Sequence, residues 1–358
     1  MIGVGVIGAN PQGSWGVHAH IPAIQALEGL RVAAVATTRM ATASETAARF
    51  GIPHAFDNPE ALAAHPQVDL VTVAVRVPEH GRLVRAALAA GKAVYCEWPL
   101  GIDPAEAEAL LAEAQAAGVR HVVGLQSRAA PIVEYVRRLV AAGRIGRLLA
   151  TTMIHSGPWP VASPSNLAYL QHAESGGNFA TIRAGHSLDA LTYALGDFAE
   201  LSATTATLIE TVSLTDTGGT TRRTTPDQIA VTGRLRNGAV AAVHMQGGPA
   251  RGAGLRWEIA GEKGDLLVQA PSGTTGVQMT ADLTLHEIAA DGTQRQLVPP
   301  PELTTAQAPA GMAFNVAQMY ARFRDGLPLP DFADAVRHHR LLDAVARAQA
   351  SGQRQALA

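Results

Sequence analysis

Residues 69–100, "DLVTVAVRVPEHGRLVRAALAAGKAVYCEWPL", decide the fold of this chain. The apolar runs 69–75 and 93–97 are predicted strands, and the spacing of apolar residues over 81–90 predicts a helix between them. Both strands are apolar throughout rather than alternating, as expected where helices cover both faces of a parallel sheet. The stretch therefore predicts one strand–helix–strand unit of a doubly wound parallel sheet.

The same alternation continues on either side of this unit. Further strands and helices are predicted at 2–8, 22–29, 31–37, 41–50, 104–117 and 121–126. We therefore expect an α/β fold whose N-terminal domain, residues 1–125, is a Rossmann doubly wound parallel sheet that binds a dinucleotide.

Beyond residue 125 the pattern changes. A helix is predicted over 130–142, and several strand-like runs follow between residues 201 and 288, joined by turns such as Asn237-Gly238. These runs predict an α+β domain over residues 126–358 with a large, mostly antiparallel open sheet.

Composition excludes several classes of function. The chain has 358 residues, of which 28 are basic and 30 acidic, so its formal net charge of -2 provides no positive surface for nucleic acid or an anionic membrane. No apolar run approaches the ~20 residues that span a bilayer, and no signal peptide is recognisable. The single cysteine, Cys96, is expected to be a buried core residue rather than a reactive thiol. We expect a cytoplasmic protein that binds neither nucleic acid nor membrane.

Two pairs of histidines do not predict a metal site. His18 and His20 lack a third ligand at a suitable spacing, and His20 fits packing at a helix start better. His338 and His339 are neighbours on a predicted helix, so their side chains are expected to point to different sides. We expect no bound metal.

The turn after the first strand is the first chemical signal. It reads "GVIGANPQGSWGVHAHIPAI" over residues 5–24, and it is about four residues longer than a G-x-G-x-x-G fingerprint. Glycine lets the backbone approach a pyrophosphate, and the following helix offers N–H groups to that charge. The alternative is an ordinary strand-to-helix turn. We predict cofactor contacts from Gly8, Asn10, Ser14 and Trp15.

The end of the second predicted strand bears on cofactor preference. An acidic residue there would bond the adenosine ribose and repel a 2′-phosphate, whereas this strand ends in Thr37, Thr38 and Arg39. Hydroxyls and a guanidinium suit a phosphate, so we predict NADP rather than NAD, with contacts from Thr38 and Arg39. The alternatives are NAD and an Arg39 that is simply solvated.

Four residues of the opening stretch carry a family resemblance: Pro78, His80, Glu97 and Pro99. They match the Pro-x-His and Glu-Lys-Pro elements of the glucose–fructose oxidoreductase and inositol dehydrogenase (Gfo/Idh/MocA) family, which this chain resembles over nearly its whole length. The long first loop and the Glu-Trp-Pro-Leu element are more similar to the branch that contains the fungal galactose-regulon repressor, an NADP-binding co-repressor of transcription. The resemblance implies further cofactor contacts from Val75, His80, Glu97, Trp98 and Gln126.

Trp98 occupies the position of the family's catalytic lysine. That lysine holds the substrate hydroxyl and assists its proton transfer, whereas an indole has one donor and no titratable proton. The indole could pack beside the nicotinamide or form an apolar wall for a sugar. Ile182 stands where the family usually has Asp, while His186 remains, and Asp189 could share its helical face and orient it. We expect His186 and Asp189 to be catalytic; the alternative is that this stretch is only a helix start.

Three functions remain open. We favour an NAD(P)-dependent oxidoreductase that acts on a sugar, polyol or related glycoside. The alternatives are a catalytically inactive NADP-binding regulator or sensor that binds another protein, and a redox-neutral enzyme that retains its cofactor. The resemblance implies that the second domain binds the substrate and that its open sheet pairs two copies into a homodimer or dimer of dimers. An exposed sheet face of mixed Val, Leu and Thr also needs a partner. The resemblance also implies a carbohydrate-binding cleft formed by Trp98, Arg128, His155, Trp159, Tyr169, Arg183 and His186.

Overall fold

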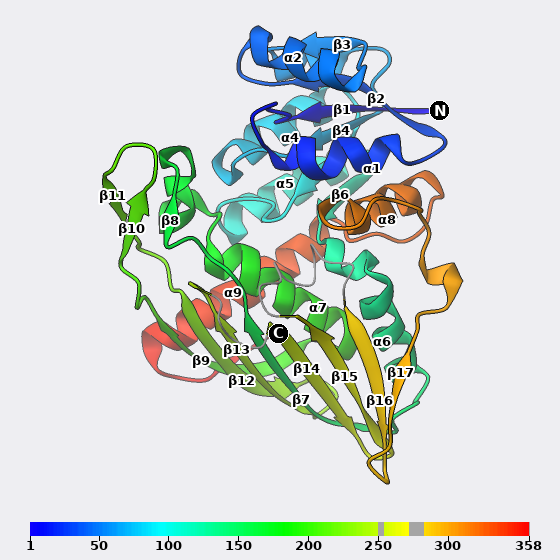
Figure 1. The fold of residues 1–358 in the computed structure, drawn as a ribbon, viewed down its shortest axis with the longest axis vertical. Coiled ribbons are helices and arrows are strands. Elements are labelled where there is room, and N and C mark those ends of the chain that lie inside the picture. Colours follow the sequence, from blue (N-terminus) through cyan, green and yellow to red (C-terminus); the bar gives the residue numbers. More distant parts are fainter. Residues whose placement is uncertain (250–253, 272–282, 358) are drawn as a thin grey trace. The chain divides into compact units, whose positions relative to one another are not determined.

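The computed structural model describes residues 1–249, 254–271 and 283–357 (Figure 1). Contacts between residues divide the chain into two compact units. Unit 1 consists of residues 1–129 and 304–339, and unit 2 consists of residues 130–303 and 340–358.

Unit 1 is built on a six-stranded sheet in the order β3-β2-β1-β4-β5-β6. All neighbouring pairs are parallel. This is the doubly wound order that the alternation of strands and helices predicts, so the predicted Rossmann fold is confirmed. The strands are β1 (Ile2–Ile7), β2 (Leu30–Ala36), β3 (His54–Phe56), β4 (Leu70–Val73), β5 (Ala93–Glu97) and β6 (His121–Gly124).

The helices of this sheet begin where the sequence provides caps. Asp103 accepts a hydrogen bond from Glu106 N and precedes Pro104, which fixes the start of α5, and Gly118 ends that helix at a φ of 63°. The short β3 and α3 were not predicted, because so few residues carry little periodicity. None of the described helices is long and apolar enough to cross a bilayer. The helices are α1 (Ile21–Gln25), α2 (Met40–Phe50), α3 (Pro59–Ala64), α4 (His80–Ala89) and α5 (Pro104–Ala117).

Residues 304–339, which the sequence pattern groups with the second domain, pack within unit 1 instead. Helix α8 (Met312–Arg324) lies against α1 and against the π-helical turn η1 (Gly16–His20). Val316 and Tyr320 of α8 are fully buried in the same core as Ile24 of α1. The apolar face of α8 is thus covered by the first unit, a long-range pairing that no local pattern indicates.

Unit 2 contains a nine-stranded sheet in the order β17-β16-β15-β14-β7-β13-β12-β9-β18. β7 and β13 pair in parallel, and the other described pairs are antiparallel. The predicted large, mostly antiparallel sheet is therefore confirmed. The β12–β13 hairpin turns at Asn237-Gly238 as predicted, with Gly238 at a φ of 91°. The strands are β7 (Leu148–Ser156), β9 (Phe198–Ala206), β12 (Gln228–Leu235), β13 (Val240–Gln246), β14 (Leu255–Gly261), β15 (Gly264–Ala270), β16 (Thr284–Ala289), β17 (Gln294–Leu297) and β18 (Gln355–Ala356).

The two faces of this sheet differ. One is covered by α6 (Pro131–Ala141), α7 (Gly185–Leu195) and the part of α9 (Phe332–Ser351) that follows residue 339 (Figure 1). Trp257 is fully buried in that core, and its Nε1 donates to Thr151 Oγ1 at 2.9 Å. Because side chains alternate along a strand, the other face presents the remaining positions, including Ile154 at 41% and Val240 at 59% exposure.

Candidate functional site

The carboxyl ends of four neighbouring strands in unit 1 gather many of the predicted cofactor contacts. Gly8 follows β1, Val75 lies just beyond β4, Glu97 ends β5, and Gln126 lies just beyond β6. In an open parallel sheet a ligand binds at this edge, beside the point where the strand order reverses. Here that point lies between β1 and β4. The fold thus brings together residues that lie far apart in the sequence.

Gly8 has a conformation and surroundings that exclude a side chain. Its φ is 99°, and a Cβ at this position would lie 2.2 Å from the carbonyl oxygen of Ala74. The ends of β1 and the segment after β4 therefore approach each other closely. This explains glycine at the strand end, where a dinucleotide-binding turn also requires one.

The loop that follows Gly8 is folded by its own polar side chains. Asn10 Oδ1 accepts from Gln12 N at 3.0 Å. Ser14 Oγ accepts from Val17 N at 3.3 Å and so lies at the start of η1. Asn10 and Ser14, both predicted cofactor contacts, therefore shape the loop in the structure described.

Trp15 carries an indole donor that is unpaired in the part of the chain that the structure describes. Its indole Nε1 is buried and makes no hydrogen bond to any residue that the structure describes. Buried donors are almost always paired, so this nitrogen fits an acceptor on a ligand, such as a phosphate or ribose oxygen. Together with the close approach at Gly8, this donor makes the loop a good fit for a dinucleotide.

The end of β2 carries no carboxylate. Thr37 Oγ1 donates to Arg39 O at 2.9 Å and lies 2.6 Å from Thr42 Oγ1, which fixes the turn into α2. Thr38 and Arg39 are exposed. The Arg39 side chain makes no hydrogen bond or ion pair within the described ranges, so its guanidinium can reach a ligand.

His80 links the segments that follow β4 and β5. Its Nδ1 lies 2.8 Å from Pro99 O, and its Nε2 lies 3.2 Å from Val75 O. Burial lowers the pKa of His80, so the ring is neutral at pH 7 and has a single N–H. The shorter contact assigns that proton to Nδ1, which donates to Pro99. His80, a predicted cofactor contact, therefore fixes the backbone on either side of the carboxyl edge.

Glu97 lies at the end of a buried chain of polar groups. Gln126 Nε2 donates to both carboxylate oxygens, at 2.9 and 2.7 Å. His20 Nε2 lies 3.0 Å from Glu97 Oε1, at an angle poor for a hydrogen bond. His20 Nδ1 lies 2.8 Å from Tyr320 Oη, which lies 2.8 Å from Thr72 Oγ1. With the His20 proton facing the carboxylate, Tyr320 donates to His20 and Thr72 donates to Tyr320. Sequence reasoning missed Thr72 and Tyr320, because the contacts join distant segments.

Trp98 contacts two consecutive histidines of α9, a contact that the sequence did not indicate. The indole is 4% exposed, and its ring centroid lies 4.7 Å from that of His338 and 4.6 Å from that of His339. Consecutive helical residues differ by about 100° in direction, so the indole lies across the helix surface between them. Burial, and then the nearby His338, lower the pKa of His339 to about 3, while Asp103 opposes the shift.

Helix α7 of unit 2 carries both predicted catalytic residues. His186 and Asp189 are buried and lie about one helical turn apart. The chain enters α7 through a π-helical segment, η6 (Phe179–Ala184). Ser187 Oγ, on the same helix, lies 3.1 Å from Nδ1 of His155 on β7. The structure thus brings His155 to the start of α7, and Ser187 is a residue that sequence reasoning missed.

Three further predicted substrate residues belong to the same unit. Trp159 is buried and packs edge to face on Phe179, with ring centroids 5.7 Å apart. Tyr169 is half-buried in the 3-10 segment η4 (Ser165–Gln171). Burial lowers the pKa of Arg183 to about 10, which leaves the guanidinium charged at pH 7. Unit 2 therefore offers aromatic surface and a buried cation.

An ion pair that the sequence did not reveal anchors this part of unit 2. Arg223 Nη1 lies 3.0 Å from Asp227 Oδ2, and both side chains are fully buried. Arg223 also donates to Gln171 Oε1 at 2.8 Å and to Pro160 O at 2.5 Å. Because a buried charge is costly without partners, these bonds fix the loop on both sides of Tyr169. The sequence did not indicate this pair, because an Arg and an Asp four positions apart are also typical of an exposed ion pair.

Arg128, predicted to contact the substrate, is bonded within unit 1. Its Nη1 donates to Asp334 Oδ1 at 2.7 Å, and its carbonyl oxygen accepts from Arg322 at 3.3 Å. These bonds join the 3-10 segment η3 (Gln126–Ala129) to α8 and α9. Its contact with a substrate remains a prediction.

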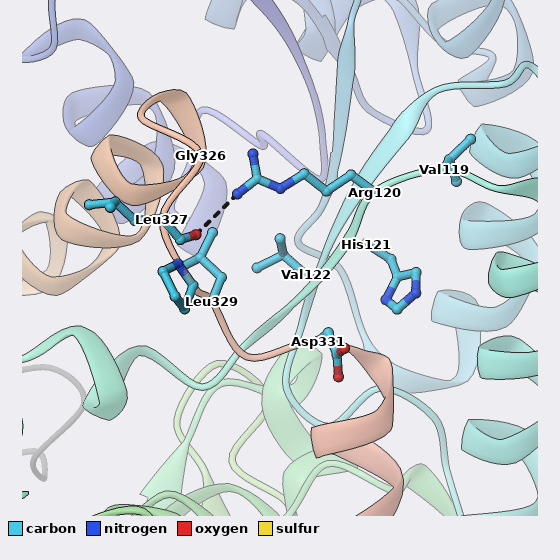
Figure 2. Close-up of a pocket in the computed structure, with 9 residues that line it drawn as sticks. Val119, Arg120, His121, Val122, Gly326, Leu327, Leu329 and Asp331 are labelled. Atoms are coloured by element: carbon cyan, nitrogen blue, oxygen red, sulfur yellow. Dashed lines mark hydrogen bonds between the residues drawn. The ribbon is translucent and has the colours of Figure 1, made fainter.

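An open cavity of about 520 Å³ lies at the amino end of β6, away from the carboxyl edge (Figure 2). Residues of 119–122 and 326–331 line it, and none of them is a predicted site residue. Arg120 donates to Phe323 O at 2.6 Å and to Leu327 O at 3.3 Å, so it caps the C-terminus of α8. The cavity is therefore not part of the candidate site.

Two family models match the chain. Residues 2–125 match the Gfo/Idh/MocA oxidoreductase family model, described as an NAD-binding Rossmann fold. Residues 131–270 match the C-terminal domain of Gal80p.

Relatives include both a dehydrogenase and a regulator. Dehydrogenase aclE of Aspergillus oryzae is 34% identical over 253 residues, which cover 68% of this chain and 69% of the relative. The galactose/lactose metabolism regulatory protein GAL80 of Kluyveromyces lactis is 30% identical over 297 residues, 76% of this chain and 64% of the relative.

Solved structures show the same fold. A super-repressor mutant of Gal80p from Saccharomyces cerevisiae has a TM-score of 0.87 at 22% identity, over 99% of this chain and 97% of that chain. A levoglucosan dehydrogenase in complex with NADH and levoglucosan has a TM-score of 0.82 at 22% identity, over 99% of each chain.

Proposed function

The chain belongs to the Gfo/Idh/MocA oxidoreductase family, and on that premise we propose that it is an NAD(P)-dependent oxidoreductase acting on a sugar, polyol or related glycoside. The observation that carries the proposal is the carboxyl edge of the unit 1 sheet. There Gly8 leaves no room for a side chain, and the buried Nε1 of Trp15 has no acceptor among the described residues.

The residues of this edge bind and orient the cofactor. Gly8 lets the backbone approach the pyrophosphate, and Trp15 donates to one of its oxygens or to a ribose. His80 holds the backbone of Val75 and Pro99 in place. When bound, the nicotinamide ring exchanges a hydride with the substrate.

The cofactor is NADP(H) in preference to NAD(H). Thr38 and Arg39 are exposed at the end of β2, and the sequence there contains no carboxylate that would repel a 2′-phosphate. The preference for NADP(H) is thus supported by the positive charge of Arg39 and by the exposure of Thr38 and Arg39.

On the substrate side, His186 transfers the proton of the reacting hydroxyl. An imidazole can accept and return a proton near pH 7, whereas Trp98 cannot. Asp189, about one helical turn further on, orients the ring. Trp159 and Tyr169 supply aromatic surface for the face of a sugar, and Arg183 and His155 supply polar contacts.

The chain acts as a homodimer or dimer of dimers, paired through the exposed sheet face that includes Ile154 and Val240.

A second candidate function is a cofactor-binding regulator that binds another protein and performs no turnover. Two observations favour it: Trp98 stands where the resembling enzymes have lysine, and residues 131–270 match the C-terminal domain of Gal80p. A third is a redox-neutral enzyme that retains its cofactor.

One experiment separates the three. The purified protein is incubated with NADP+ and, in parallel, NAD+, together with a panel of neutral sugars, polyols and glycosides. Absorbance of the reduced cofactor and loss of each substrate are both followed. We expect reduced cofactor to accumulate with at least one substrate. Substrate loss without reduced cofactor would support the redox-neutral enzyme, and neither signal across the panel would support the regulator.

A further inference from the structure

His339 carries a buried polar atom that has no partner among the described residues. The side chain is 5% exposed, and its Nε2 is buried without a hydrogen bond to any residue in the described ranges. An imidazole nitrogen in the interior almost always has a partner, because a polar atom that is buried without one loses its hydrogen bonds to water. Because the described residues provide no partner, a bound group is the simplest partner for this atom.

The position of the His339 ring indicates that the missing partner of Nε2 is a bound ligand. Its centroid lies 4.6 Å from the indole of Trp98, the residue that directly follows the last residue of β5. The His339 ring thus lies beside the carboxyl edge, where an open parallel sheet binds its ligand.

The charges of this corner favour an uncharged ligand. Trp98 is neutral, and His339 is held neutral because burial keeps its pKa far below 7. The carboxylate of Asp103 acts on His339 and raises its pKa against the effect of burial, so the charge near this ring is negative. A carboxylate or phosphate would meet this negative charge, and neither Trp98 nor the neutral His339 would offset it. A hydroxyl group can donate or accept, so it can pair with Nε2 in either tautomer of a neutral imidazole.

We propose that His339 determines substrate specificity by forming a hydrogen bond through Nε2 with a hydroxyl group of an uncharged polyol bound at the carboxyl edge of unit 1. The inference rests on the proposed function for the identity of the site. It assigns the contact with the hydroxyl to α9, while Trp98 packs against the ring and provides an apolar surface.

Three substitutions test the atom itself. In His339→Gln an amide nitrogen or oxygen can reach the place of Nε2, in His339→Asn the amide reaches only the place of Nδ1, and in His339→Leu no polar atom remains. We expect His339→Gln to bind the polyol within about threefold of the unchanged protein. We expect His339→Asn and His339→Leu to raise KM, or Kd where there is no turnover, about tenfold or more, the scale of one lost hydrogen bond. NADP(H) affinity and thermal stability should change little.

The corresponding changes at His65, a half-buried histidine of unit 1, serve as controls. If the Leu variant does not fold, the Gln and Asn pair carries the test. Equal polyol affinity in all variants would overturn the proposal, as would equal losses in the Gln and Asn variants.

A second readout does not depend on turnover. The NADP+-loaded protein is labelled with 15N-histidine, and the His339 signals are assigned by their loss in His339→Gln. Adding the best panel polyol, or glycerol if none reacts, should shift the His339 Nε2 resonance and leave that of His80 in place. No shift with any neutral polyol would mean that a water satisfies this nitrogen, and the proposal would be wrong. A shift without any hydride transfer would retain the site and refute the proposed oxidoreductase.

Discussion

The hydroxyl of Tyr320 lies 2.8 Å from Nδ1 of His20, and this contact joins helix α8 to the turn η1 that follows the loop after β1. The same hydroxyl lies 2.8 Å from Thr72 in the middle of the sheet. On its other side, His20 faces Glu97 at 3.0 Å. The position of Glu97, and with it that of Trp98, therefore depends on a residue near the C-terminal end of the chain.

Replacing Tyr320 with Phe should destabilise the protein. The substitution leaves His20 Nδ1 and Thr72 Oγ1 without their partner in a buried region, which costs about 1–3 kcal/mol of unfolding free energy. Urea denaturation measures the change. Tyr135→Phe, at a half-buried tyrosine of α6, is the matched control and should change stability by less than about 0.5 kcal/mol. Equal effects of the two substitutions would argue against the network.

Replacing Arg39 with Ala should weaken NADP(H) binding selectively. Loss of a charge-assisted contact to the 2′-phosphate corresponds to about 1–2 kcal/mol, or about 5- to 30-fold in Kd. Titration of the tryptophan fluorescence with NADP(H) and with NAD(H) measures both affinities. Arg39→Lys keeps the charge and should lose less. NAD(H) binding as tight as NADP(H) in the unchanged protein would refute the preference.

Replacing His186 with Ala should abolish turnover and leave cofactor binding intact. A proton-transfer group contributes mainly in the transition state, so kcat should fall at least ~100-fold while the NADP(H) Kd stays within about twofold. Steady-state kinetics and fluorescence titration provide the two values. Retained turnover would show that another group moves the proton.

Replacing Trp98 with Lys should not improve the reaction. The new ammonium would be buried beside the neutral ring of His339, where a charge without a partner is costly. We expect kcat/KM to fall and thermal stability to decrease. Trp98→Phe, which keeps an aromatic ring, is the control and should retain most of the stability. A gain in kcat/KM for the lysine variant would contradict the idea that the site is formed around an indole.

The exposed face of the unit 2 sheet should form the subunit interface. Ile154 and Val240 are both exposed on that face, and a charge placed there should oppose pairing of two apolar surfaces. Light scattering should give at least twice the monomer mass for the unchanged protein and a lower mass for Ile154→Asp. Ile102→Asp, at an exposed position of unit 1, should keep the oligomer. A monomer at all concentrations would refute the interface.

Much of the fold could be predicted because it rests on local patterns. The apolar runs before Gly8 and around Cys96 are long enough to show buried strands, and Asn237-Gly238 marks its hairpin by backbone preference alone. Cys96 is fully buried, and burial raises the pKa of its thiol, as expected for a core residue. The predicted cofactor residues follow successive strands, so their gathering at one edge follows from a parallel sheet.

The type of each unit, and the edge of the sheet at which the predicted cofactor residues gather, could therefore be read from the sequence alone, since both depend on residues close together in the chain. Tertiary structure alone decided that α8 and the start of α9 pack with unit 1, that Tyr320 reaches His20, and that His338 and His339 both contact Trp98. These contacts join segments separated by more than two hundred residues. Their formation depends on which apolar faces are buried together, and the periodicity of a single segment shows only that a face is apolar, not which partner covers it.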